Sequence, residues 1–150
     1  MMTPLRASNR LLIVEDDVLI ATVLKDELED AGYHILDLTD RTADALEVAK
    51  GRAPNLALVN IDLADGDDGV ELADALKTLG IPVLLISGQV SRARSARTVA
   101  IASLPKPYDA ADMVRAVDYL LARLQGNASR PKPMGLEVFD EDVFEFAAAN

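Results

Sequence analysis

The chain has 150 residues, of which 50% are hydrophobic and none is cysteine, so disulfides and thiolate metal sites are excluded. Its net charge of -10 at pH 7 disfavours direct binding to nucleic acid and favours a cation or a basic protein surface as the partner. Because the sequence contains neither an apolar signal segment nor an apolar stretch of membrane-spanning length, we expect a cytoplasmic protein without membrane contact.

Apolar runs too short to form helices alternate with amphipathic helical patterns along most of the chain. Asp17 and Asp109 are placed to cap the first and last of these helices, and Thr42 is placed to cap the second. The predicted strands cover residues 11–14, 34–38, 56–61, 83–86 and 101–104. The predicted helices cover residues 18–31, 43–51, 70–79, 89–100 and 110–124, and the fourth is the weakest because its apolar stripe is thin.

Five strand–helix units with short connections predict an α/β fold, a doubly wound five-stranded parallel sheet with helices on both faces. We expect the flavodoxin-like strand order 2-1-3-4-5, in which the first and third strands lie side by side where the order reverses. The carboxyl ends of all five strands then meet at one edge of the sheet. The polar residues expected at this edge are Glu15, Asp16, Asn60, Asp62, Ser87 and Lys106.

The composition changes after residue 125. The chain is long enough for one domain, which we place at residues 9–125 behind an N-terminal extension at 1–8. Residues 126–135 are rich in Gly, Pro, Ser and Lys and predict a linker. Residues 136–150 predict an acidic amphipathic tail that folds back on the domain, docks on a partner as a short helix or strand, or stays disordered.

The residues at the expected edge are those of a phosphoryl-transfer site. Clustered carboxylates in a chain with no cysteine and one histidine suit a hard cation such as Mg²⁺. Lys106 adds a compact positive charge, and Ser87 adds a hydroxyl that can donate a hydrogen bond to a phosphoryl oxygen. A carboxylate nucleophile would complete such a site.

Four motifs in this order resemble the receiver domain of bacterial two-component response regulators over about residues 9–125. They are Leu12-Ile13-Val14-Glu15-Asp16-Asp17, the strand at 56–61 with its Asp- and Gly-rich loop, Ile86-Ser87-Gly88, and Pro105-Lys106-Pro107-Tyr108. The resemblance implies that Glu15 and Asp16 are the acid pair that binds Mg²⁺. It also implies that Ser87 is the switch hydroxyl and that Lys106 contacts the phosphoryl group.

Two positions depart from the family pattern. The phosphoacceptor aspartate of the family ends the third strand, and Asn60 occupies that position here, although an amide oxygen can still ligate a metal. Ser103 stands where many receivers carry a switch Tyr or Phe.

Asp62 follows Asn60 by two residues, so a continuing strand would direct both side chains to one side of the sheet. Asp62 is therefore either a substitute acceptor and metal ligand or a solvated loop acid beside an inactivated site. The sequence also leaves open that Asn60 is an engineered replacement of an ordinary acceptor.

The leading interpretation is a stand-alone, atypical receiver domain in a two-component phosphorelay. It would act through protein contacts, either independently of phosphorylation or through Asp62, and its only reaction would be its own phosphorylation from a phosphodonor. Its cofactor would be Mg²⁺, bound weakly because of Asn60, with Glu15, Asp16, Asn60 and Asp62 as the candidate ligands.

The expected partners are a histidine kinase or phosphotransfer protein and a downstream protein target. The resemblance places the target on the helix within 89–100, the strand at 101–104 and the helix at 110–124, with a homodimer as a further arrangement. The alternative interpretation is a Mg²⁺-dependent phosphohydrolase on a related α/β fold, with Asp62 or Asp16 as the nucleophile.

Overall fold

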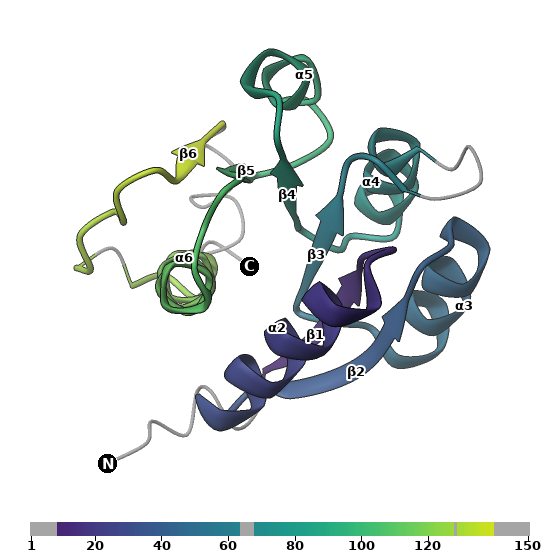
Figure 1. Ribbon diagram of the computed structural model, residues 1–150, viewed down its shortest axis with the longest axis horizontal. Coiled ribbons are helices and arrows are strands. Elements are labelled where there is room, and N and C mark those ends of the chain that lie inside the picture. Colours follow the sequence, from purple (N-terminus) through teal and green to yellow (C-terminus); the bar gives the residue numbers. More distant parts are fainter. Residues whose placement is uncertain (1–8, 64–67, 128, 140–150) are drawn as a thin grey trace.

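Strands and helices alternate along the part of the chain that the computed structural model describes, residues 9–63, 68–127 and 129–139 (Figure 1). The strands are β1 (Arg10–Val14), β2 (His34–Thr39), β3 (Leu56–Asn60), β4 (Val83–Ser87), β5 (Ala102–Pro105) and β6 (Glu137–Val138). The helices are α2 (Val18–Asp30), α3 (Thr42–Arg52), α4 (Gly69–Thr78), α5 (Val90–Ser95) and α6 (Ala110–Leu124). The predicted N-terminal extension, residues 1–8, lies outside the described residues.

The strands form one sheet in the order β2-β1-β3-β4-β5-β6. The first five strands are parallel to their neighbours, and β6 runs antiparallel to β5. The predicted order of the first five strands is therefore confirmed. The predicted number of strands is one too small, because the start of the tail returns to the sheet as β6. The rest of the tail, residues 140–150, lies outside the described residues.

Helices cover both faces of the sheet, as predicted (Figure 1). Leu11 and Ile13 of β1 pack in one apolar layer with α2 and α6. The alternate residues Leu12 and Val14 pack in the other layer with α3, α4 and α5. Because both faces of the central strands are buried, β3 and β4 are apolar almost throughout rather than alternating in polarity.

The helix ends follow the capping groups of the sequence at two of three predicted places. The carboxylate of Asp17 accepts hydrogen bonds from two backbone N–H groups of α2, and Asp109 forms a capping box with Asp112 at the start of α6. Thr42 is not a cap, contrary to the prediction. It is the first residue of α3, and Arg41 precedes it without a side-chain capping bond.

Two helices differ from their predicted form. α5 spans only Val90–Ser95, much less than the predicted residues 89–100. α2 buries Leu24 and Leu28 as predicted, but Ile20 and Val23 of the same predicted stripe are 37% and 55% exposed. The start of α2 therefore presents apolar side chains on the outside of the molecule.

β2 forms one edge of the sheet and contains an irregularity. The register between β1 and β2 shifts once, which leaves Leu36 without an opposite residue on β1. The guanidinium of Arg52 donates a hydrogen bond to the carbonyl oxygen of Leu36 at 3.0 Å. The backbone N–H of Leu38 donates to the carboxylate of Asp37 at 2.8 Å. Side chains thus satisfy two backbone groups of this strand.

Candidate functional site

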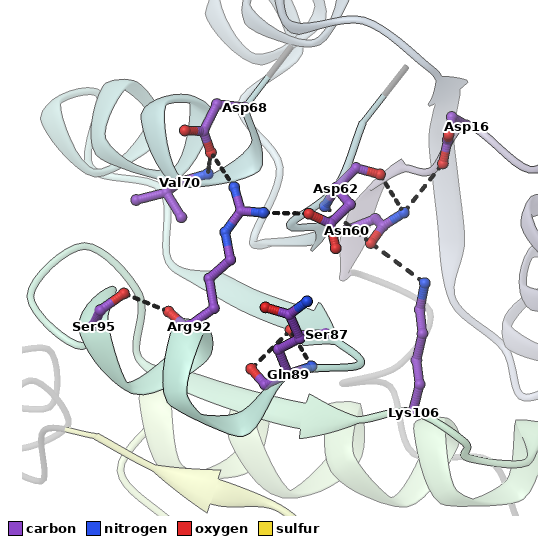
Figure 2. Close-up of polar contacts among 10 residues, drawn as sticks. All are labelled: Asp16, Asn60, Asp62, Asp68, Val70, Ser87, Gln89, Arg92, Ser95 and Lys106. Atoms are coloured by element: carbon purple, nitrogen blue, oxygen red, sulfur yellow. Dashed lines mark hydrogen bonds and ion pairs between the residues drawn. The ribbon is translucent and has the colours of Figure 1, made fainter. Parts of the chain in front are cut away.

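The carboxyl ends of β1, β3 and β5 bring Glu15, Asp16, Asn60 and Lys106 together at the predicted edge of the sheet. Figure 2 shows the amide of Asn60 between Asp16 on one side and Lys106 on the other. The carboxylate of Asp62 points away from this group, and the hydroxyl of Ser87 bonds within its own loop. The predicted site residues therefore share one edge of the sheet but do not all converge.

Asn60 is 3% exposed, and both ends of its amide form hydrogen bonds. Its Nδ2 lies 2.8 Å from Oε2 of Glu15, 3.1 Å from Oδ1 of Asp16 and 2.9 Å from the carbonyl oxygen of Asp62. Its Oδ1 accepts from Nζ of Lys106 at 3.4 Å and from the backbone N–H of Asp62 at 3.3 Å. The opposite amide orientation would place an oxygen against two carboxylates and an NH₂ group against an ammonium, so the charges determine this one.

Glu15 is the most deeply buried acid of the site, with 4% of its surface exposed. Its Oε2 accepts from Asn60 and from the backbone N–H of Asp17, whereas its Oε1 has no hydrogen-bond partner among the described residues. Burial and a hydrogen bond with Asp16 raise the pKa of Glu15, and these causes outweigh the Asp17 N–H, Lys106 and Asn60, which lower it. The carboxylate of Glu15 is therefore costly to keep ionised.

β3 ends at Asn60, so the continuing strand that would align Asp62 with Asn60 is not present. The carboxylate of Asp62 instead forms an ion pair with Arg92 of α5, which also contacts Asp68 at 3.3 Å (Figure 2). Asp62 contacts Asn60 through its main chain instead, by its carbonyl oxygen and its N–H. The sequence did not identify Arg92 as a residue near the site, because a run of arginines is typical of a solvated surface. The available signal was the acidic loop after β3, whose carboxylates need a cationic side chain to pair with.

Ser87 is 2% exposed, and its hydroxyl closes the turn after β4. It donates to the carbonyl oxygen of Gln89 at 3.0 Å and accepts from the N–H of Gln89 at 2.9 Å. Ser103, at the position of the family's switch aromatic residue, is 5% exposed.

Tyr108 is a neighbour of the site that the sequence reasoning did not single out. Its hydroxyl is buried and has no hydrogen-bond partner among the described residues. Burial, with the nearby charge of Glu15, raises the pKa of Tyr108 to about 12, so the phenol stays neutral.

Gly69 allows α4 to begin directly against the end of β3. Its backbone N–H donates to the carbonyl of Ile61 at 2.9 Å. A Cβ atom at residue 69 would lie 2.3 Å from the carbonyl oxygen of Asn60 and 2.7 Å from Cα of Ile61, so only glycine fits. Asp68, the residue before it, caps α4 by accepting from the N–H of Val70 at 2.8 Å.

The Asn60 amide leaves the side chains of the site poorly arranged for a divalent cation. Glu15 and Asp16 provide carboxylates and Asp62 a carbonyl, but Asn60 directs N–H groups toward these oxygens where a metal would need ligands. Within residues 9–63, 68–127 and 129–139, no three His, Cys, Asp or Glu side chains form a group that could hold a metal ion. The four predicted ligands are therefore not assembled as a set.

A mainly apolar groove of about 460 Å³ adjoins Lys106 on the side of α2. It lies between the exposed start of α2 and the segment that follows β5. Its lining consists of Leu19, Ile20, Val23, Leu24, Lys106, Pro107, Tyr108 and Ala110.

Among the described helices, none is long and apolar enough to span a membrane.

Comparison with protein families finds a match to the model of the response regulator receiver domain at residues 11–118. The phyllosphere-induced regulator PhyR of Methylorubrum extorquens is 33% identical over 87 residues, which cover 57% of this chain and 33% of that protein. The transcriptional regulatory protein PdtaR of Mycobacterium tuberculosis is 31% identical over 121 residues, which cover 77% of this chain and 58% of that protein. The match thus spans about a third of the length of PhyR and somewhat over half of the length of PdtaR.

Solved structures with the same fold include receiver domains. A CheY-like response regulator receiver domain protein from Methanospirillum hungatei superposes with a TM-score of 0.69 at 28% identity, covering 75% of this chain and 93% of that one. The receiver domain of NtrX from Brucella abortus superposes with a TM-score of 0.69 at 30% identity, covering 74% of this chain and 97% of that one. The similarity to these structures therefore covers about three quarters of this chain rather than an isolated motif.

Proposed function

Because the chain belongs to the response regulator receiver domain family, we propose that it signals through protein contacts that do not depend on phosphorylation. In the family pattern, the phosphoryl group is accepted by an aspartate at the position of Asn60. The proposal concerns how this site acts without that aspartate.

The hydrogen bonds of the Asn60 amide carry the proposal. Its NH₂ group lies against Glu15 and Asp16, and its oxygen lies against Lys106. One neutral side chain therefore connects the acid pair to the lysine through direct hydrogen bonds. An amide oxygen without formal charge is a much weaker nucleophile than a carboxylate, so Asn60 holds the site together but does not accept a phosphoryl group.

The surroundings of Asp62 argue against its use as a substitute acceptor. Its carboxylate is paired with Arg92 on the side away from Lys106 (Figure 2). An attack by Asp62 would require this ion pair to break and the loop after β3 to turn its side chain toward the acid pair. The same placement disfavours the phosphohydrolase alternative with Asp62 as nucleophile. Asp16, the other nucleophile considered for the phosphohydrolase, accepts a hydrogen bond from the amide of Asn60.

Receiver domains generally bind Mg²⁺ at the acidic pocket, and we propose that this site binds it more weakly than a site with aspartate at position 60. The amide of Asn60 lacks the negative charge of a carboxylate, and its N–H groups face Glu15 and Asp16. The thermal unfolding temperature of the wild type should accordingly respond little to Mg²⁺, whereas that of Asn60→Asp should rise with Mg²⁺. Equal responses of the two proteins would contradict weak binding by the wild type.

The proposed partners are a histidine kinase or phosphotransfer protein and a downstream protein target. The apolar groove beside Lys106 and the exposed side chains of Val18, Leu19 and Val23 support a protein contact next to the site. The predicted surface of α5, β5 and α6 remains a second proposed contact. A partner that binds this second surface would contact β6, which pairs with β5 there.

Intact-mass spectrometry after incubation with Mg²⁺ and acetyl phosphate tests the proposal. The wild type and Asp62→Ala should stay unmodified, and Asn60→Asp should gain one hydroxylamine-labile phosphoryl group. An adduct on the wild type that Asp62→Ala abolishes would identify Asp62 as the acceptor and overturn the proposal. Release of phosphate from a generic phosphate ester by the wild type would favour the phosphohydrolase instead.

A further inference from the structure

The edge of β5 is occupied by the chain's own residues 136–139. Figure 1 shows β6 beside β5 on the side of the sheet opposite β2. In the antiparallel pairing, Val138 lies opposite Ala102 and Glu137 opposite Ser103. The N–H of Phe139 adds a hydrogen bond to the carbonyl of Ile101 at 2.9 Å. This strand lies beyond residues 11–118, the part that matches the family model.

Side chains of residues 136–139 alternate between the two faces of the sheet. Leu136 is 3% exposed and lies with Val138 in the apolar layer of α2 and α6. Phe139 packs in the opposite layer, which contains α5. On that side, Nε of Arg94 in α5 donates to both carboxylate oxygens of Glu137, at 3.0 and 3.3 Å. The edge of β5 thus accepts a strand with the pattern Leu, acid, apolar, aromatic.

The occupant is held by few contacts. β6 has two residues, and only Leu136 is fully buried, while Val138 and Phe139 are half-buried. The Arg94 side chain of the ion pair is 63% exposed, which weakens it through solvent screening. Such a segment opens more readily than the central strands.

The pairing also leaves part of β5 available. β6 is opposite Ala102 and Ser103 only, so Leu104 of β5 has no opposite residue on β6. A longer strand could pair further along β5 in the direction of Lys106. It would therefore make more contacts than residues 136–139 make.

We propose that the edge of β5 is a binding site for an extended segment of a partner protein with an apolar–acidic–apolar–aromatic pattern. Residues 136–139 are its intramolecular occupant, which the partner displaces by strand addition. This inference deepens the proposed protein-contact function and rests on it. A second copy of the chain would offer only the same segment, which competes poorly with the attached one because the attached one has a high effective concentration. Two copies, each with net charge -10, also repel one another. A different protein with a longer strand is therefore the favoured occupant.

α5 gives this edge a connection to the candidate site. Arg94 contacts Glu137 of β6, while Arg92, two residues earlier, contacts Asp62 after β3. Displacement of Glu137 therefore removes an anchor from the helix that also holds the loop beside Asn60.

The test uses the full chain and a fluorescent peptide with the sequence of residues 133–139 as the probe. The chain has no cysteine, so Ala102→Cys with Val138→Cys introduces a single possible disulfide across the β5–β6 pair. Peptide binding is measured by fluorescence anisotropy for four proteins: the wild type, the oxidised cysteine variant, the same variant after reduction, and Leu136→Ser. Met134→Ser is the matched control, because Met134 is 97% exposed in the same segment.

Leu136→Ser should bind the peptide about ten-fold more tightly than the wild type, because its own segment competes less well. Met134→Ser should bind like the wild type, the oxidised variant should not bind, and reduction should restore binding. A peptide with serine in place of its leucine should lose affinity for every form.

Equal binding by the oxidised and reduced cysteine variant would overturn the proposal, even if Leu136→Ser fails to fold. Disulfides formed between chains instead of within them would also overturn it and would assign the edge to a second copy. The assay contains neither Mg²⁺ nor a phosphodonor. Its failure would therefore leave the proposal about Asn60 standing, and an adduct on Asp62 would leave this one standing.

Discussion

At the scale of single residues, the site combines one costly acid with a neutral connecting group. Glu15 is buried beside Asp16, and Asn60 supplies an N–H to each of them. A hydrogen-bond donor reduces the cost of burying a carboxylate but does not neutralise it. One oxygen of Glu15 also has no partner among the described residues. Glu15 should therefore leave a measurable pH dependence.

Replacement of Glu15 by glutamine should increase the free energy of unfolding at neutral pH. The pKa of Glu15 is raised above its ordinary value of 4.5, chiefly by burial, so the folded state binds its proton more tightly than the unfolded state does. The wild type should therefore lose stability relative to Glu15→Gln as the pH rises from 4.5 through the raised pKa. Below 4.5 this contribution disappears, because the carboxyl is protonated in both states. Urea unfolding of both proteins over a pH series measures the difference, and a constant difference would contradict the argument.

Replacement of Gly69 by alanine should destabilise the fold by about 2 kcal/mol, because the new Cβ atom would meet the backbone of Asn60 and Ile61. Gly51 of α3 is the matched control, since a Cβ atom there meets nothing within 4 Å. Gly51→Ala should stabilise the protein by about 0.5–1 kcal/mol through helix propensity and reduced freedom of the unfolded chain. Urea unfolding of the two variants compares them directly. Destabilisation by both would show that the contact at Gly69 is not the cause.

At the scale of elements, the stability of α5 comes from its contacts with the rest of the protein rather than from the helix itself. A helix of six residues is too short to be stable alone, and its N-cap residue Gln89 forms no side-chain capping bond. Ala93 packs in the core, and Arg92 and Arg94 form ion pairs with the loop after β3 and with β6. α5 therefore responds to changes in either neighbour.

Arg92→Ala should increase hydrogen exchange in α5 and in the described residues beside the loop after β3, because it removes the ion pairs to Asp62 and Asp68. Global stability should fall by less than about 1 kcal/mol, since these pairs are partly exposed. Arg97→Ala, which changes an exposed arginine just beyond α5, is the control and should leave exchange near the wild-type level. Unchanged exchange in Arg92→Ala would mean that the core contacts alone hold α5.

The sequence predicted elements wherever one physical signal dominated. Unbroken apolar runs predicted β1, β3 and β4, and Asp17 and Asp109 predicted two helix starts, because burial and capping act locally. The extent of α5 and the presence of β6 depend on tertiary contacts that leave little local pattern. In the site, the strand ends predicted Glu15, Asn60 and Lys106 as neighbours. The direction of the Asp62 side chain depended on where β3 stops, which periodicity does not resolve.

At the scale of the whole molecule, the family match and the sheet do not end at the same place. The matched residues, 11–118, include β1 to β5 and stop within α6. The chain then continues beyond α6, and Arg130 contacts Asp118 of that helix at 3.7 Å. Residues 136–139 next join the sheet as its sixth strand. This chain therefore adds its own strand to the side of the family fold where protein contacts are proposed.

The two sides of the sheet bear on how concentrated solutions of the protein behave. An uncovered strand is a template on which identical molecules can polymerise, and the growth of such fibrils needs free backbone groups at both ends of the sheet. On one side, β6 already pairs with β5. On the other, the bulge at Leu36 interrupts the ladder, and Arg52 and Asp37 satisfy backbone groups of β2. The interrupted ladder and the side-chain bonds of Arg52 and Asp37 therefore disfavour pairing of the β2 edge with a second copy of the chain.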